Sequence, residues 1–203
     1  MNYKQYIKEQ NTFLEVKALK YDTAEEFIKN QGPPLYHGTY LKLEKLMTTR
    51  ELSDEIADTV LGYGQHTFGI YLTPKKELAK KFGNNIIECY VYVKNMLDLR
   101  NISTFEMLAT ALGVDIIKEK YAIRNMKIDS CFNDYGFKDD IYRPLESLVY
   151  KFKIEDELQE KYNGIIFNDR EGSVYGETYI IFNSNNIKTK QQLINIWNRV
   201  TSK

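Results

Sequence analysis

Leu35-Tyr36-His37-Gly38-Thr39 carries an apolar approach straight into a histidine and a glycine, and Gly69-Ile70-Tyr71-Leu72-Thr73 places a tyrosine on a second expected strand. A glycine lets a ligand press against bare backbone, where no side chain intervenes. The histidine ring offers a nitrogen to a ribose hydroxyl, and the tyrosine offers a flat face to a nicotinamide ring. Each segment alone is more typical of a strand end or of ordinary packing, but the pair suits the binding of a dinucleotide.

The segments around these two motifs alternate between helical and strand patterns. Thr23-Ala24-Glu25-Glu26 is a capping box, and it predicts a helix that stops at Gly32-Pro33-Pro34. Apolar, β-branched and aromatic residues predict the strands, which are 35–37, 68–72, 86–93, 164–167 and 178–182. The remaining expected elements are helices at 42–60 (one or two), 74–82 and 191–200, and a polar loop at 168–176.

This order of elements predicts an α+β fold with short strands and helices between them. The 203 residues fit a single domain, 1–203, with N-terminal helices at 1–32. Residues 101–162 are expected to be a mostly helical insertion, with breaks at Gly113, Gly136 and Pro144.

The composition limits the kinds of binding partner and the cellular compartment that we expect. Lys plus Arg and Asp plus Glu both number 28, so the formal net charge is zero, which argues against binding nucleic acid with the whole domain. No stretch reaches the roughly 20 apolar residues that would cross a membrane, so no membrane partner is expected. The two cysteines, Cys89 and Cys131, indicate neither a disulfide framework nor metal spacing. A cytoplasmic location is therefore the default expectation.

Taken together, the motifs resemble the ADP-ribosyltransferase superfamily, in its poly(ADP-ribose) polymerase and diphtheria-toxin (H-Y-E) branch. The likeness is closest to the small transferase domains of bacterial and phage polyvalent proteins. It rests on the two motifs quoted above and on Thr23-Ala24-Glu25-Glu26-Phe27, which resembles the entry to the first of them. Three further segments add to it, which are Val91-Tyr92-Val93-Lys94-Asn95-Met96-Leu97-Asp98-Leu99, Tyr162-Asn163-Gly164-Ile165-Ile166-Phe167, and Tyr179-Ile180-Ile181-Phe182-Asn183 with Ile187-Lys188. The resemblance covers most of 23–99 and 160–190, and it implies a split β-sheet core with flanking helices.

The resemblance implies a cleft for NAD, used as a co-substrate without a metal. His37 would hold a ribose hydroxyl, the Gly38 backbone would hold the nicotinamide carboxamide, and Thr39 would support the same pocket. Tyr71 would stack on the nicotinamide. Phe82 stands eleven residues after Tyr71, where the polymerase branch carries a second aromatic that closes the other face of the ring. Two aromatic rings around a cationic ring are physically reasonable, because their quadrupoles attract positive charge.

The third motif departs from the family pattern. The branch carries a glutamate at the start of the strand, and the aligned position here is Thr178, with Glu177 one residue earlier. Alternation along a strand points these two residues to opposite faces. Either a bulge or a frayed strand start brings Glu177 into the site as the catalytic acid, or Glu171 enters from the preceding loop, or the site lacks an acid and Thr178 lines it.

Two classes of function follow from the resemblance. The first is a mono-ADP-ribosyltransferase, an effector or toxin of phage or bacterial conflict, whose macromolecular acceptor is expected to be a protein rather than a nucleic acid. The second is a transferase-like module without catalysis, which binds NAD, ADP-ribose or a protein partner. An NAD glycohydrolase, with water as the acceptor, is a third hypothesis.

Overall fold

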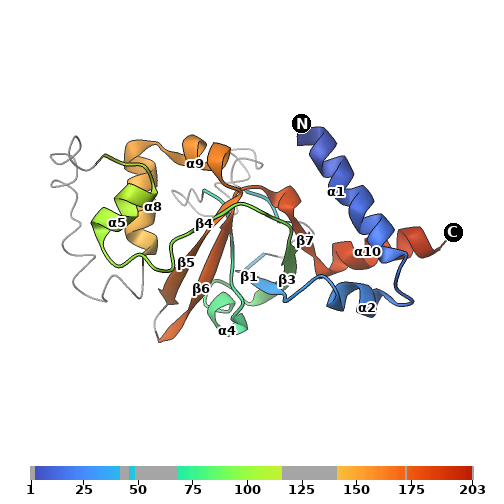
Figure 1. Cartoon of the computed structure of the whole chain (residues 1–203). Helices are drawn as coiled ribbons and strands as arrows, with labels where there is room; N and C mark the ends of the chain where they lie inside the picture. Colours follow the sequence, from blue (N-terminus) through green and yellow to red (C-terminus); the bar gives the residue numbers. More distant parts are fainter. Residues whose placement is uncertain (1–2, 42–45, 49–67, 116–140, 172, 203) are drawn as a thin grey trace.

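Residues 3–41, 46–48, 68–115, 141–171 and 173–202, the part of the chain described by this computed structural model, are built around two β-sheets (Figure 1). One sheet has the strand order β1-β3-β7, and the other has the order β2-β6-β5-β4. The strands are β1 (Leu35–Thr39), β2 (Ile70–Leu72), β3 (Asn85–Val91), β4 (Met96–Asp98), β5 (Gly164–Glu171), β6 (Val174–Ile181) and β7 (Ile187–Thr189). With helices on their flanks, the two sheets confirm an α+β fold with a split sheet.

The two sheets meet where β1 passes β2. β1 pairs antiparallel with β3, and β2 pairs antiparallel with β6, with Tyr71 opposite Ile180. Between the sheets, Tyr36 and Thr73 form a bridge through two backbone hydrogen bonds of 2.7 and 3.0 Å. The two motifs singled out in the sequence therefore lie side by side at this junction.

The β5–β6 hairpin is longer than the sequence pattern indicates. Its strands pair residue by residue from Gly164 opposite Ile181 to Glu171 opposite Val174. The expected polar loop at 168–176 is therefore wrong, because most of it is strand with one buried and one exposed side. The strands β4 and β7 are not among the strands expected from residue composition.

Three helices cover the sheet that contains β3. These are α1 (Tyr3–Ala18), α2 (Ala24–Lys29) and α10 (Lys190–Thr201), and Figure 1 shows them together at one end of the molecule. Their shared core includes Leu14, Phe27 and Leu193, all fully buried, and Tyr90 of β3. Half of the expected capping box forms, because the Thr23 hydroxyl accepts a hydrogen bond from the Glu26 backbone N–H at 3.2 Å.

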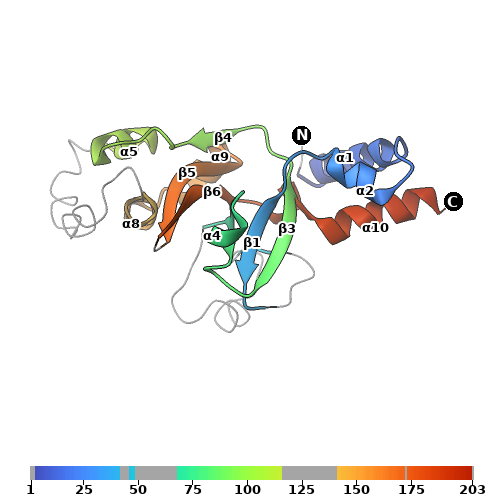
Figure 2. The ribbon, with the colours of Figure 1, turned by 90° about the horizontal axis from the view of Figure 1, so that it is seen from below.

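Helix α4 (Lys76–Ala79) is shorter than the expected helix at 74–82. Pro74 precedes the helix instead of opening it, because the chain stays extended at Lys75. Figure 2 shows α4 between β1 and β6, and it contacts both strands. Most of the expected helical region at 42–60 lies outside the described residues.

The insertion contributes helices α5 (Phe105–Ala111), α8 (Tyr142–Phe152) and α9 (Glu155–Lys161), while residues 116–140 lie outside the described part. Pro144 does not break the chain as expected, because it occupies the first turn of α8, where a proline costs no hydrogen bond. Leu145, Leu148 and Val149 of α8 are fully buried against the β5–β6 hairpin.

The four-stranded sheet therefore has two distinct faces. One, which we name the α8 face, comprises Tyr71, Ile165, Phe167, Asp169, Thr178 and Ile180. The opposite face carries Ile70, Leu72, Glu177, Tyr179 and Ile181, and its apolar residues pack toward Cys89 and Ile187 of the three-stranded sheet. Every candidate residue on β2 and β6 is assigned to one side by this alternation.

Candidate active site

His37 on β1 reaches across the junction to β2. Its Nδ1 lies 2.9 Å from the backbone carbonyl oxygen of Tyr71, 34 residues further along the chain. A carbonyl only accepts, so Nδ1 carries the hydrogen and Nε2 keeps its lone pair in the neutral ring. Burial lowers the pKa of His37 below its usual value and outweighs the opposite effect of the bond to Tyr71. The ring is therefore neutral near pH 7, and Nε2 can accept a hydrogen bond.

Gly38 follows at a point where α4 closes on the strand. A Cβ at this position would overlap the backbone carbonyl of Ala79, so only glycine fits. Alternate residues of an antiparallel strand direct their N–H and C=O to the same side. Tyr36 directs its pair to Thr73, so Gly38 directs its own to the same edge of β1, beyond the bridge. No described residue forms a backbone hydrogen bond with Gly38 there, so within the described part of the chain one donor and one acceptor face an amide ligand.

Tyr71 lies on the α8 face with its hydroxyl buried. Its ring packs edge-on against Phe68 and Tyr142, with centroids 6.4 and 5.6 Å away. The Tyr142 oxygen is near enough to affect the Tyr71 hydroxyl, but no described residue makes a hydrogen bond of normal geometry with it. Burial raises the pKa of Tyr71 well above its usual value, and the neighbouring Tyr142 adds to the effect. The phenol is therefore neutral, and its oxygen is a buried polar atom without a good partner.

Phe82 and Thr39 are the two residues expected to complete the pocket. Phe82 follows α4 and is 49% exposed, and its ring is not in contact with that of Tyr71. The Thr39 hydroxyl accepts a hydrogen bond from the Leu41 backbone N–H at 3.1 Å, so it holds the chain that leaves β1. The described rings that pack against Tyr71 include Tyr142, which comes from the insertion. No local pattern predicts where that helix docks.

The surroundings of the third motif depend on how β6 pairs with β5. β6 pairs with β5 without interruption from Val174 to Ile181, so no bulge or frayed start turns Glu177 into the site. Thr178 lies on the α8 face with Tyr71, and Glu177 lies on the opposite face. Glu171 ends β5 opposite Val174, and its side chain lies outside the described part.

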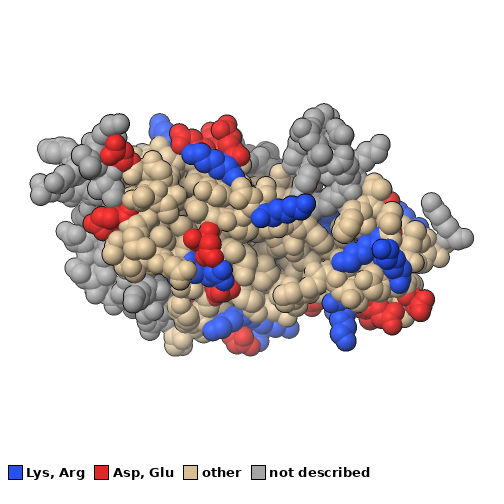
Figure 3. All heavy atoms as spheres, viewed as in Figure 1, with Lys and Arg blue, Asp and Glu red and all other residues tan. Residues whose placement is uncertain are grey.

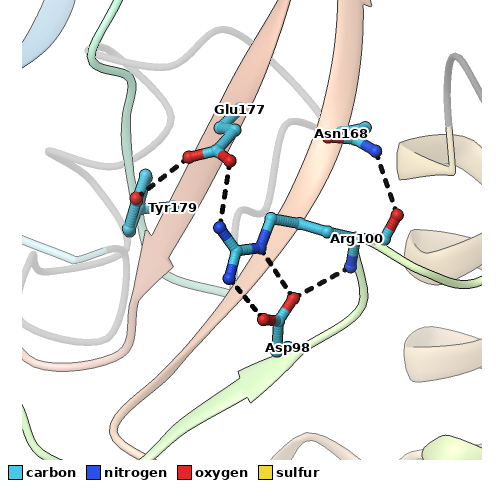
Figure 4. Close-up of polar contacts among 5 residues, drawn as sticks. All are labelled: Asp98, Arg100, Asn168, Glu177 and Tyr179. Atoms are coloured by element: carbon cyan, nitrogen blue, oxygen red, sulfur yellow. Dashed lines mark hydrogen bonds and ion pairs between the residues drawn. The ribbon is translucent and has the colours of Figure 1, made fainter.

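On its own face, Glu177 belongs to a polar cluster that ties three strands together (Figure 4). Its carboxylate accepts hydrogen bonds from Arg100 Nη1 at 3.0 Å and from the Tyr179 hydroxyl at 3.1 Å. Arg100 also donates to both carboxylate oxygens of Asp98, through Nε at 2.9 Å and Nη2 at 2.5 Å. These hydrogen bonds hold the pKa of Asp98 below its usual value. These contacts link the Glu177 carboxylate on β6 through Arg100 to Asp98 on β4.

Asp169 is the residue near the third motif that sequence reasoning missed. It is 9% exposed, and its Oδ2 accepts a hydrogen bond from the Thr178 hydroxyl at 2.9 Å, while Thr178 itself is 4% exposed. Alternation with Ile165 and Phe167 would have placed Asp169 on the buried side of β5, had residues 168–171 been assigned to the strand.

The described residues show neither a cluster of metal ligands nor a membrane-spanning helix. Among them, no three His, Cys, Asp or Glu side chains gather as the ligands of a metal ion would. The expectation that the chemistry needs no metal stays a prediction. In the same part of the chain, no helix is both long enough and apolar enough to span a bilayer.

Comparison with known proteins supplies the family. A family model described as an ADP-ribosyltransferase in polyvalent proteins matches residues 29–192, well over half of the chain and both motifs. A search of the curated proteins finds no match. Among solved structures, the crystal structure of an anti-CRISPR protein matches at 15% identity and a TM-score of 0.37, covering 77% of this chain and 93% of that one. A likeness that low carries no argument, whereas the family match does: the chain belongs to the ADP-ribosyltransferases of polyvalent proteins, a family that uses NAD as its substrate.

Proposed function

We propose that this chain is a mono-ADP-ribosyltransferase, which breaks the bond between nicotinamide and ribose in NAD and passes ADP-ribose to a macromolecular acceptor. One observation carries the proposal: His37 Nδ1 is hydrogen-bonded to the Tyr71 carbonyl, which brings the histidine and tyrosine motifs to one place. The family to which the chain belongs supports the same reaction.

The residues at the junction fit NAD in four ways. The outward N–H and C=O of Gly38 suit the carboxamide, which needs one donor and one acceptor. The Nε2 of His37 can accept a hydrogen bond from a ribose hydroxyl. The Tyr71 ring would offer a face to the nicotinamide, and in this proposal the half-exposed Phe82 would cover the other face.

The chemistry requires positioning and charge more than it requires a nucleophile. When the bond between the ribose C1′ and the pyridinium nitrogen breaks, its electron pair stays with nicotinamide, and positive charge develops on the sugar, as in glycoside hydrolysis. A protein accelerates this step by holding both ends of the substrate and by placing an acceptor or a negative charge beside the sugar.

For the acceptor, we propose a protein rather than a nucleic acid, and a cytoplasmic effector role in phage or bacterial conflict. The formal net charge is zero. On the face seen in Figure 3, basic and acidic side chains are interspersed and no basic band stands out. The absence of a charge excess disfavours tight phosphate-backbone binding.

The test is release of nicotinamide from NAD, followed by mass spectrometry of a lysate incubated with the protein and labelled NAD. Wild type should release nicotinamide and label a target, whereas His37→Ala and Tyr71→Ala should do neither. Phe13→Ala serves as the control, because this ring on α1 is 61% exposed and lies outside the site. Equal activity in all four proteins, or none in any, would contradict the proposal.

A second candidate is a non-catalytic module that binds NAD or ADP-ribose. Two observations favour it: Thr178 stands where the family resemblance expects an acid, and Tyr142 of α8 packs against Tyr71. Calorimetry that detects NAD binding without any turnover would support this candidate. If free ADP-ribose accumulates without a labelled target, the chain is instead an NAD glycohydrolase.

A further inference from the structure

We infer that Asp169 supplies the carboxylate of this active site and that Thr178 positions it. The inference rests on the proposed function and assigns its missing acid. In the family pattern, one glutamate on the strand that corresponds to β6 supplies the negative charge. Here the task is divided between neighbouring strands, with the hydroxyl on β6 and the carboxylate on β5.

The first argument is the face on which both residues lie. Thr178 is directly opposite Phe167 in the β5–β6 pairing, and Asp169 follows Phe167 by two residues, so all three side chains share the α8 face with Tyr71. One strand spacing and two residues of rise separate Thr178 from Tyr71, which is about 8 Å between Cα atoms. A nicotinamide riboside of that span, with its ring against Tyr71 and its sugar near Thr178, requires Tyr142 of α8 to move off the Tyr71 ring.

The second argument is burial. Asp169 is only 9% exposed, on a sheet face that is otherwise largely apolar. Burying a carboxylate is costly unless hydrogen bonds or charges compensate, and such groups gather at functional sites. The hydroxyl of Thr178 donates to one oxygen, Oδ2, at 2.9 Å. This hydrogen bond fixes the orientation of the Asp169 carboxylate, whereas the carboxylate of a solvated aspartate rotates freely.

The third argument concerns two other acids, Glu177 on β6 and Glu146 on α8. Glu177 lies on the opposite face, where Arg100 and Tyr179 hold it (Figure 4). Glu146 of α8 accepts a hydrogen bond from the Tyr142 hydroxyl at 2.9 Å. Of these carboxylates, only that of Asp169 contacts the position that aligns with the family's acid.

The role of Asp169 can be written as a balanced step. The C1′–N bond of NAD breaks, its electron pair goes to the ring nitrogen, and neutral nicotinamide leaves. The Asp169 carboxylate accepts a hydrogen bond from the 2′-hydroxyl of the same ribose and stabilises the positive charge at C1′. An oxygen or nitrogen of the acceptor then bonds to C1′ and releases its proton to solvent.

The test combines turnover with binding. Nicotinamide release is measured for wild type, Asp169→Asn, Thr178→Val and Thr178→Ser, with Asp22→Asn as a matched control at an exposed aspartate. Binding of NAD and of its analogue without that 2′-hydroxyl is measured by calorimetry, and folding by circular dichroism. We expect Asp169→Asn to lower release roughly 100- to 1,000-fold. Thr178→Val should also lower release, and Thr178→Ser should restore it because the hydroxyl returns.

Binding provides a readout that a purely structural aspartate would not change. Loss of the 2′-hydroxyl should weaken binding to wild type about tenfold, since a hydrogen bond to a charged group is lost. In Asp169→Asn the same loss should have little effect. If Asp169→Asn does not fold, the same comparison is made with Thr178→Val, in which the penalty should shrink.

The outcomes separate this inference from the proposed function. Wild-type release that persists in Asp169→Asn, or an equal 2′-hydroxyl penalty in both proteins, overturns the role of Asp169 and leaves the transferase proposal standing. NAD binding that depends on Asp169 without any turnover supports the assignment and overturns the transferase proposal. A wild-type protein that neither binds NAD nor releases nicotinamide overturns both.

Discussion

Replacing Tyr71 with phenylalanine is expected to stabilise the free protein. The Tyr71 hydroxyl is buried, and no described residue gives it a hydrogen bond of normal geometry. Such an unpaired polar atom costs about 1–3 kcal/mol. Phenylalanine removes the oxygen and keeps the edge-on contacts with Phe68 and Tyr142. We therefore expect the free energy of unfolding to rise by about 1 kcal/mol, the low end of that range, because the nearby Tyr142 oxygen already compensates in part.

The assay is urea unfolding followed by circular dichroism, with thermal unfolding beside it. For a chain of this size, a gain of about 1 kcal/mol raises the melting temperature by roughly 2–4 °C. Tyr71→Ala is the comparison, and it should lower stability by about 3 kcal/mol because the ring itself is lost from the core. A loss of 1 kcal/mol or more in Tyr71→Phe would refute the reasoning, since it would mean that the hydroxyl is well satisfied.

Three further outcomes are expected. Because burial lowers the pKa of His37 below 6.5, protonation favours the unfolded chain. Its contribution to stability is present above pH 6.5 and is lost as the pH falls, so urea unfolding between about pH 7 and pH 5 should show a shallower loss in His37→Gln. Glu177→Gln should lower stability by about 0.5 kcal/mol, because its ion pair with Arg100 is exposed, and should leave nicotinamide release unchanged. Gly38→Ala should cost about 1–3 kcal/mol and abolish NAD binding, because the methyl group displaces α4; unfolding and calorimetry check both effects.

Local sequence patterns predicted the elements whose formation depends on residues close together in the chain. Thr23 begins a helix because its hydroxyl satisfies a free backbone N–H three residues later, and both partners are visible in the sequence. Apolar and aromatic residues correctly predicted strands around His37 and Tyr71, although α4 is shorter than the expected helix. That these two strands would meet could not be derived from either pattern alone. It came from the resemblance of their order to a known family.

The errors concern contacts between distant segments. Residues 168–171 have a polar composition, which favours a loop, but pairing with β6 keeps them in a strand and buries Asp169. The contact of Glu177 with Arg100, 77 residues away on the other face of the sheet, is likewise not visible in the local sequence. The contact between the Tyr142 and Tyr71 rings depends on where α8 packs on the sheet. An amphipathic pattern predicts a helix but does not specify its packing partner.

The most direct test of the account is an experimental structure of the protein crystallised with nicotinamide. We expect the carboxamide to bond to the N–H and C=O of Gly38, with the ring against Tyr71 and the His37 ring nearby. Nicotinamide bound at another surface, or density that leaves the Gly38 edge of β1 without a ligand at saturating concentration, would contradict the account.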